Sequence, residues 1–223
     1  MGILVWRMAW FRWLALGLLV LGIGGGLSTA IAQNANGGKK RIVVLGDSIT
    51  AGYGLDGGTS EAYPALIQKK IDEAGLPYTV ANAGVSGDTT AGGLRRVDWA
   101  LGKDGADVLL VALGGNDGLR GIPPEQTEKN LTGIVAKARA KNPAMKVVIV
   151  GMQMPDNMGP DYTTAFRGVF SKVATAEKTE LIPFLLEGVG GVEQLNQADR
   201  IHPTAEGQTK IADHVWGKLK GML

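Results

Sequence analysis

Two distant segments of the chain carry side chains that together could form a catalytic triad. Ser48 follows a short β-branched run and enters a glycine-rich turn. Asp199 and His202 lie near the other end of the chain, three residues apart. A carboxylate at this spacing can accept a hydrogen bond from the imidazole, which orients the ring and stabilises its cation. The imidazole could then remove a proton from the serine hydroxyl, so the combination predicts a serine nucleophile with its general base.

Each part of this arrangement also has an interpretation without catalysis. Ser48 could cap the turn that follows it, and its glycine-rich loop could hold a phosphate on backbone N–H groups. Asp199 and His202 could merely fasten a loop. A metal site is disfavoured, because the only other histidine, His214, lies in a helical stretch and the chain has no cysteine. The three residues in combination favour catalysis, and no metal is expected.

Acyl transfer also needs hydrogen-bond donors for the oxyanion that develops in the transition state. Three candidates are the backbone N–H groups of Ser48 and Gly87 and the side-chain amide of Asn116. Glycine leaves the approach of the acyl group unobstructed, and asparagine is a neutral donor that does not compete with the histidine for the proton. Taken alone, Gly87 is typical of a plain turn and Asn116 of an Asx turn.

The elements that must position these residues alternate along the chain. Short β-branched runs predict strands at Ile42–Leu45, Thr79–Ala81, Val108–Leu113, Val147–Val150 and Leu181–Phe184. Stretches with helical spacing lie between and after them, at residues 60–74, 89–102, 125–141, 161–177 and 204–220. This alternation predicts one α/β domain, a three-layer α/β/α sandwich around a mostly parallel five-stranded sheet. Ligands bind beyond the carboxyl ends of such strands, where Ser48, Gly87 and Asn116 would meet.

The first 32 residues have the pattern of a secretory signal peptide. Arg7 and Arg12 precede an uncharged apolar run, and the run ends in a small-residue site at Ala30 and Ala32. Cleavage after Ala32 is favoured over a permanent anchor, because the run is shorter than the roughly 20 apolar residues of a membrane-spanning helix. The protein is therefore expected to be periplasmic or secreted, with no stable membrane anchor after cleavage.

The remaining chain is predicted to consist of a polar tether, residues 33–40, and a folded domain, residues 41–223. The full sequence has 23 basic and 21 acidic residues, and two of the basic residues belong to residues 1–32. The mature chain is thus formally neutral. Nucleic acid is not expected as a partner, because it would require a basic face.

Four blocks of this sequence resemble those of the SGNH hydrolases, which are also called GDSL esterases and lipases. The blocks are Gly46-Asp47-Ser48-Ile49, Gly87, Gly114-Gly115-Asn116-Asp117 and Asp199-Arg200-Ile201-His202. Ile49 departs from the leucine of the family's motif. The resemblance implies a flavodoxin-like fold, no cofactor and a triad of Ser48, Asp199 and His202. It also implies an oxyanion hole built from Ser48, Gly87 and Asn116.

The details of these blocks are most similar to a bacterial group of periplasmic thioesterases, arylesterases and lysophospholipases. Met152, Met154 and Pro155 resemble the acyl-binding loop of that group, and methionine suits a pliable apolar pocket. The resemblance implies that the substrate is a small acyl ester or thioester, with lysophospholipids in the same class, cleaved through an acyl-enzyme on Ser48. Two alternatives stay open: a carbohydrate acetyl esterase of the same fold, and a non-catalytic flavodoxin-like binding module.

Overall fold

The computed structural model describes residues 38–223, so the predicted signal peptide and most of the predicted tether lie outside the described residues. The first element is strand β1 (Lys40–Gly46), which begins one residue before the predicted start of the domain. Lys40 belongs to the strand because its N–H donates to the Pro77 carbonyl at 2.8 Å and because it lies opposite Tyr78 in the sheet register.

Five parallel strands form the central sheet. Strand β1 is followed along the chain by β2 (Tyr78–Gly84), β3 (Val108–Ala112), β4 (Lys146–Val150) and β5 (Glu180–Ile182). Their spatial order is β2-β1-β3-β4-β5, with every neighbouring pair parallel. This is the flavodoxin-like order, whose topological switch point lies between β1 and β3. The predicted fold class is confirmed.

All five strands differ from their predicted boundaries by one to three residues, and in β2 and β5 the physical reason is clear. Strand β2 is longer than the predicted Thr79–Ala81, because this edge strand is half-buried and continues through polar and small residues to Gly84. Strand β5 ends at Ile182 and not at Phe184, because Pro183 has no N–H with which to continue the ladder.

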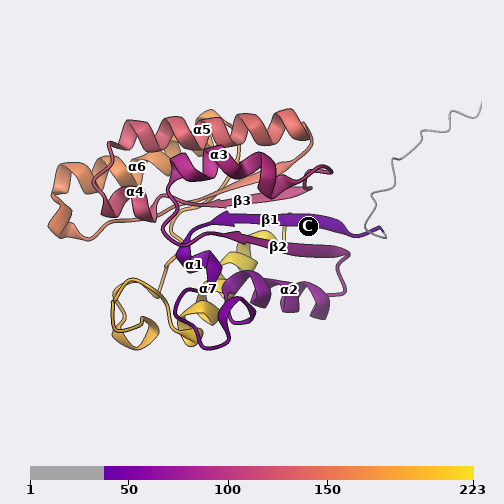
Figure 1. Cartoon of the computed structure of the whole chain (residues 1–223), viewed down its shortest axis with the longest axis horizontal. Helices are drawn as coiled ribbons and strands as arrows, with labels where there is room; N and C mark the ends of the chain where they lie inside the picture. The colour runs from indigo at the N-terminus through magenta and orange to yellow at the C-terminus, as the bar shows by residue number, and fades with distance from the viewer. Residues whose placement is uncertain (1–37) are drawn as a thin grey trace, which may run out of the picture. The chain divides into compact units, whose positions relative to one another are not determined.

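Helices cover both faces of the sheet (Figure 1). On one face lie α3 (Thr90–Leu101), α5 (Pro124–Lys141) and α6 (Pro160–Ala176); on the other lie α2 (Tyr63–Glu73) and α7 (Ala205–Leu219). All five residues of β3 are buried, as expected for a parallel strand covered on both sides. Within residues 38–223, none of the helices combines the length and apolarity needed to cross a membrane.

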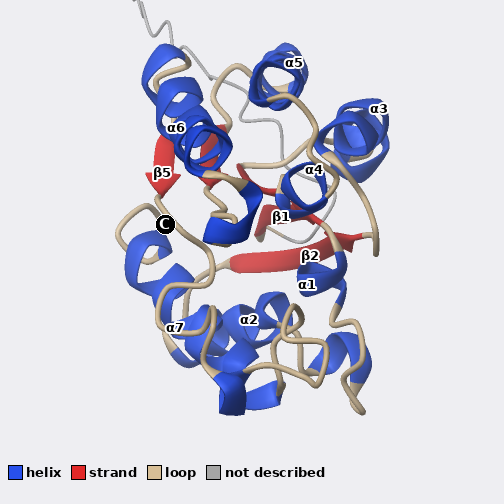
Figure 2. Cartoon of the chain, turned by 90° about the vertical axis from the view of Figure 1, so that its left-hand side faces the viewer, coloured by secondary structure: helices blue, strands red, loops and turns tan. Residues whose placement is uncertain are grey.

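Two short helices stand at the carboxyl end of the sheet. Helix α1 (Ser48–Ala51) follows β1, and α4 (Gly115–Leu119) follows β3; both face the viewer in Figure 2. The sequence predicted no helix in the segment of α4. The Gly118 N–H donates to the Gly114 carbonyl at 2.9 Å and closes a helical turn, although the glycines hide any apolar periodicity. Three 3₁₀ turns complete the list: η1 (Gly58–Ser60), η2 (Asp156–Met158) and η3 (Glu193–Leu195).

Candidate active site

Ser48 is the first residue of α1 and follows the carboxyl end of β1 by two residues. Its neighbour Asp47 caps this helix, because Asp47 Oδ1 accepts a hydrogen bond from the Ile49 N–H at 3.1 Å. The alternative in which Ser48 is the cap is therefore wrong. Ser48 is 9% exposed, and its hydroxyl is left to bond elsewhere.

Close packing against the end of β2 fixes the position of α1. A Cβ atom at Gly84 would lie 2.4 Å from the Ala51 nitrogen, so only glycine permits this approach. The side-chain amide of Asn82 donates to the Thr50 carbonyl at 2.7 Å. Both contacts join β2 to the helix that begins with Ser48.

Ser48, His202 and Asp199 form one continuous chain of hydrogen bonds. Nε2 of His202 lies 2.8 Å from Ser48 Oγ, and Nδ1 of the same ring lies 2.6 Å from Asp199 Oδ2. An ionised carboxylate can only accept, so the proton belongs on Nδ1 and Nε2 is left to accept from the serine hydroxyl. This is the tautomer that a general base acting on serine requires.

The loop that contains Asp199 also keeps its carboxyl group ionised. Oδ1 accepts the backbone N–H groups of Ile201 at 2.9 Å and His202 at 3.0 Å. Desolvation raises the pKa of Asp199, but the hydrogen bonds from the His202 backbone, the His202 ring and Ile201 outweigh it and lower the pKa to about 2. At neutral pH the group is therefore a carboxylate.

A second carboxyl group, Asp47, lies beside the nucleophile and is only 3% exposed. Burial raises its pKa to about 6, although the hydrogen bond from Ile49 and the attraction of His202 act in the opposite direction. Asp47 thus loses its proton in a pH range where Asp199 is already ionised.

Sequence reasoning missed two residues that hold the histidine loop. The ring of Tyr53 packs against the His202 ring, with centroids 4.7 Å apart and planes at 45°. The amide of Gln197 donates to the Tyr53 carbonyl at 2.8 Å and to the Pro203 carbonyl at 3.0 Å. These contacts tie the loop after α1 to the loop of His202. They join residues 144 apart in the sequence, and no local pattern signals such a pair.

The three predicted oxyanion donors differ in how the structure places them. Asn116 lies in α4 and lines the same cleft as Ser48; its Nδ2 donates one hydrogen to the Asp88 carbonyl at 2.9 Å and has a second available. Gly87 has a positive φ of 78° and does not line the cleft. Arg120 donates to the Gly87 carbonyl at 3.0 Å, and the Gly87 N–H has no recorded partner among residues 38–223.

Arg96 joins the loops that hold these donors, and sequence reasoning missed it too. Its Nε lies 2.6 Å from Asp88 Oδ2, while its Nη1 and Nη2 each donate at 2.8 Å, to the carbonyls of Ala83 and Gly46. One guanidinium therefore links the ends of β1 and β2 to the loop of Gly87. In the sequence Arg96 resembles any polar residue of a helical stretch.

Buried Asp117 fixes α4 in turn. Its Oδ2 accepts the Thr90 N–H at 2.8 Å, and its Oδ1 accepts the hydroxyls of Thr90 and Thr127. Asp117 has no exposed surface, and its two partner threonines lie on α3 and α5. The helix that presents Asn116 is thereby attached to the helical layer behind it.

A cleft of about 640 Å³ opens over Ser48 and His202. Met152, Met154 and Pro155, which the sequence predicted as substrate-binding, all line it. The rest of the wall is mainly apolar and comes from segments after the strands: Ile49, Leu119, Phe184, Leu186, Gly190, Gly191 and Ile201. The cleft therefore offers apolar surface beside a polar reacting centre.

His214 lies outside this centre, as the sequence predicted. Its Nε2 lies 3.0 Å from the Phe184 carbonyl, so the ring connects α7 to a residue of the cleft wall. Residues 38–223 contain no cluster of three or more histidine, cysteine or carboxylate side chains that could hold a metal ion.

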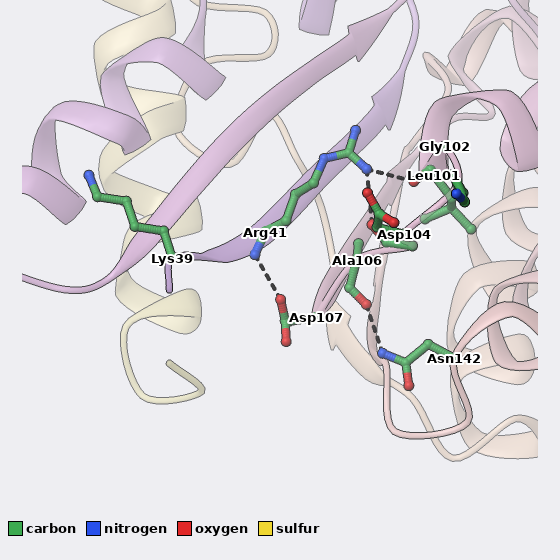
Figure 3. Close-up of a pocket in the computed structure, with 10 residues that line it drawn as sticks. Lys39, Arg41, Leu101, Gly102, Asp104, Ala106, Asp107 and Asn142 are labelled. Atoms are coloured by element: carbon green, nitrogen blue, oxygen red, sulfur yellow. Dashed lines mark hydrogen bonds between the residues drawn. The ribbon is translucent and has the colours of Figure 1, made fainter. Parts of the chain in front are cut away.

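A smaller hollow of about 270 Å³ lies at the opposite, amino end of the strands (Figure 3). Arg41 of β1 crosses it and donates to the carbonyls of Leu101 and Gly105 at 2.6 and 3.0 Å, and to that of Ala100 at 3.1 Å. The Arg41 N–H also donates to Asp107 at 2.7 Å. None of the predicted site residues lies here.

Residues 44–210 match the GDSL-like Lipase/Acylhydrolase family. Esterase TesA of Pseudomonas aeruginosa (strain PAO1) is 47% identical over 182 residues, which are 82% of this chain and 89% of that protein. Thioesterase 1/protease 1/lysophospholipase L1 of Escherichia coli (strain K12) is 37% identical over 182 residues, 82% of this chain and 84% of that protein.

Solved structures agree with this match. The crystal structure of the psychrotrophic esterase EstA from Pseudoalteromonas sp., inhibited by monoethylphosphonate, superposes with a TM-score of 0.77 at 32% identity. The superposition covers 82% of this chain and 98% of that one. Sequence and fold thus point to the same group of proteins.

Proposed function

The chain belongs to the GDSL-like lipase/acylhydrolase family of serine hydrolases, and on that premise we propose that it cleaves carboxylic esters and thioesters through an acyl-enzyme on Ser48. The observation that carries this proposal is the unbroken chain from Ser48 Oγ through the His202 ring to Asp199, at 2.8 and 2.6 Å. An Asp–His pair that only fastened a loop would not need a hydrogen bond between the second ring nitrogen and a serine hydroxyl.

In the first half-reaction Ser48 Oγ attacks the acyl carbon while its proton passes to His202 Nε2. The resulting oxyanion receives hydrogen bonds from the Ser48 N–H and from the Asn116 amide, and the Gly87 N–H is the third donor that the family resemblance implies. The bond to the leaving group then breaks, and the departing oxygen or sulfur takes the proton from Nε2. The acyl group is left on Ser48.

In the second half-reaction water attacks the acyl carbon and gives a proton to His202 Nε2. The bond between Ser48 Oγ and the acyl carbon breaks, Oγ recovers the proton, and the free carboxylic acid leaves. Asp199 keeps its negative charge throughout and stabilises the imidazolium that forms in each half. The low pKa of Asp199 supports this role.

The cleft favours long acyl chains over acetyl groups. Met152, Met154 and Phe184 provide apolar surface beside Ser48, and burial of such surface stabilises by about 25 cal/mol per Å². A long acyl chain, as in a lysophospholipid or a fatty acyl thioester, would bury more of it than acetate. The relative named thioesterase 1/protease 1/lysophospholipase L1 supports the same substrate class.

The test is hydrolysis of p-nitrophenyl esters of graded acyl length by the purified protein, with Ser48→Ala as the control. We expect kcat/KM to rise from acetyl toward longer chains, and Ser48→Ala to lose at least about 10⁴-fold in kcat. Undiminished turnover by Ser48→Ala would refute the nucleophile. A clear preference for acetyl would instead support the carbohydrate acetyl esterase alternative.

We further propose that residues 1–32 are a signal peptide, cleaved after Ala32, and that the mature enzyme is periplasmic or secreted. The charged start, apolar run and small-residue site support this. The test is N-terminal sequencing of the exported protein, which should begin at Gln33. A product that begins at Met1 in the membrane fraction would support an anchor.

A further inference from the structure

Arg200 has a backbone conformation that L-amino acids seldom adopt. Its φ is 59°, and among residues 38–223 only Lys178 is another non-glycine residue with a positive φ. Lys178 lies in the turn that ends α6, where its N–H donates to the Thr175 carbonyl at 3.3 Å, so a helix terminus accounts for it. Arg200 lies inside the triad loop, between Asp199 and His202. Strained residues of this kind cluster at ligand-binding positions.

Arg200 is one of the residues that line the cleft, and it is exposed to solvent. It is the only lysine or arginine among the described lining residues, and no hydrogen bond or ion pair of its guanidinium is recorded within residues 38–223. The adjacent carboxylate of Asp199 is already engaged by the His202 ring and two backbone N–H groups. No recorded contact of the described side chains neutralises the positive charge of Arg200.

Position along the chain indicates which part of a substrate would meet this charge. The leaving group must lie next to His202, because Nε2 delivers the proton to it. Arg200 precedes that histidine by two residues in the same loop. The apolar wall of Met152, Met154 and Phe184 comes from other loops and suits the acyl chain.

We propose that Arg200 is a specificity-determining residue that selects esters and thioesters whose leaving group carries an anion, such as a phosphate, sulfonate or carboxylate. The planar guanidinium matches these groups through paired N–H donors and stays charged at any working pH. This inference rests on the proposed function, since it assigns the leaving-group end of the same cleft.

The experiment compares two phenyl esters with the same acyl chain: a 4-acyloxybenzenesulfonate, which is anionic, and the matching 4-acyloxybenzenesulfonamide, which is neutral. The readout is the ratio of their kcat/KM values. We expect the unsubstituted enzyme to favour the sulfonate, and Arg200→Gln to lower the ratio by roughly three- to tenfold. The preference should also weaken when the salt concentration rises from about 0.01 to about 1 M.

Two further variants separate this role from effects on folding or net charge. Arg95→Gln removes one positive charge from the exposed face of α3, outside the cleft, and should leave the ratio unchanged. Arg200→Gly should lower the ratio as Arg200→Gln does, while its melting temperature stays equal or rises, because glycine adopts a φ of 59° without strain. A loss of preference in a fully folded variant cannot come from unfolding.

A third substrate pair places the anion on the acyl side: a p-nitrophenyl ester with a terminal carboxylate, beside the methyl ester of that carboxylate. An Arg200-dependent preference confined to this pair would overturn the leaving-group assignment. An unchanged sulfonate-to-sulfonamide ratio in Arg200→Gln would overturn the inference altogether, even if Ser48-dependent hydrolysis is intact. Failure of the proposed function would look different, because Ser48→Ala would then remain active on both esters.

Discussion

Each end of the sheet carries a hollow with an arginine in it, and the two arginines are used in opposite ways. At the amino end, Arg41 donates to three backbone carbonyls and its N–H donates to Asp107 (Figure 3). At the carboxyl end, Arg200 has a strained backbone, and no side-chain partner is recorded for it within residues 38–223. Both hollows are concave and both are lined by an arginine, so the presence of a guanidinium alone does not distinguish them.

The difference is whether the protein satisfies its own polar groups. At the amino end Arg41 and Asn142 donate to backbone carbonyls, Arg41 to that of Gly105 and Asn142 to that of Ala106, which is what a stable fold requires. At the carboxyl end several donors remain available for a ligand, among them the second N–H of Asn116 and the guanidinium of Arg200. Unsatisfied donors that are held rigidly are the mark of a binding site. Substitutions should therefore affect activity at one end and stability at the other.

Among the substitutions that test this difference between the two ends of the sheet, Asp199→Asn should have the largest effect. The amide can still accept the backbone N–H groups of Ile201 and His202, but it no longer stabilises the imidazolium or fixes the productive tautomer. We expect kcat to fall by about 10³–10⁴-fold with little change in melting temperature. Asp104→Asn makes the same chemical change in the amino-end hollow and should leave kcat unaltered. Near-normal activity in Asp199→Asn would mean that another group orients His202.

Asn116→Ala should have the next largest effect. Loss of one oxyanion donor typically costs about 10²–10³-fold in kcat, and we expect KM to change much less, because the oxyanion exists only after attack. The matched control is Asn142→Ala, which removes an amide that donates to the Ala106 carbonyl at 3.0 Å in the other hollow. That variant should lose about 1 kcal/mol of stability and retain its kcat. Equal losses of kcat in both variants would refute the distinction between a carboxyl end that serves activity and an amino end that serves stability.

Arg41→Gln, at the amino end, should lower the stability of the protein and leave its kcat unchanged. Three carbonyls around the end of α3 would lose their guanidinium donors, and glutamine is too short to replace them. We expect the free energy of unfolding in urea to fall by about 3–4 kcal/mol, while kcat of the folded enzyme stays the same. A loss of kcat without a loss of stability would show that the amino-end hollow takes part in the reaction.

The sequence predicted the parts of this comparison that depend on residue type and local spacing. Apolar runs located all five strands, and the serine, histidine and aspartate that the sequence combined are brought together by the fold. The sheet then placed Asn116 near Ser48, because parallel strands end at one edge.

Other features depend on contacts between distant segments and could not be predicted. Arg96 reaches Gly46 across 50 residues, and Gln197 reaches Tyr53 across 144. Helix α4 was missed because its support comes from Asp117 and from threonines on α3 and α5, and not from its own sequence. The positive φ of Arg200 likewise reflects the closing of a turn, which composition does not reveal.

The last prediction concerns the pH dependence of stability at the carboxyl end, where two carboxyl groups have opposite pKa shifts. Burial raises the pKa of Asp47 from 3.8 to about 6, so the folded protein retains this proton while the unfolded chain loses it. The contribution of Asp47 is fully present below pH 3.8 and is lost as the pH rises to about 6. Asp199 has a lowered pKa, so its contribution is lost only as the pH falls from 3.8 toward 2.

Asp47→Asn should remove the Asp47 contribution while keeping an acceptor for the Ile49 N–H. We expect the difference in unfolding free energy between this variant and the unsubstituted protein to change by roughly 2–3 kcal/mol between pH 4 and pH 7, with the variant gaining as the pH rises. Urea unfolding across that range measures it, and the subtraction cancels the titration of all other groups. If the difference in unfolding free energy stays constant with pH, the pKa of Asp47 is not raised in the folded protein. Water would then reach this carboxyl group, and the carboxyl end of the sheet would be as solvated as the amino end.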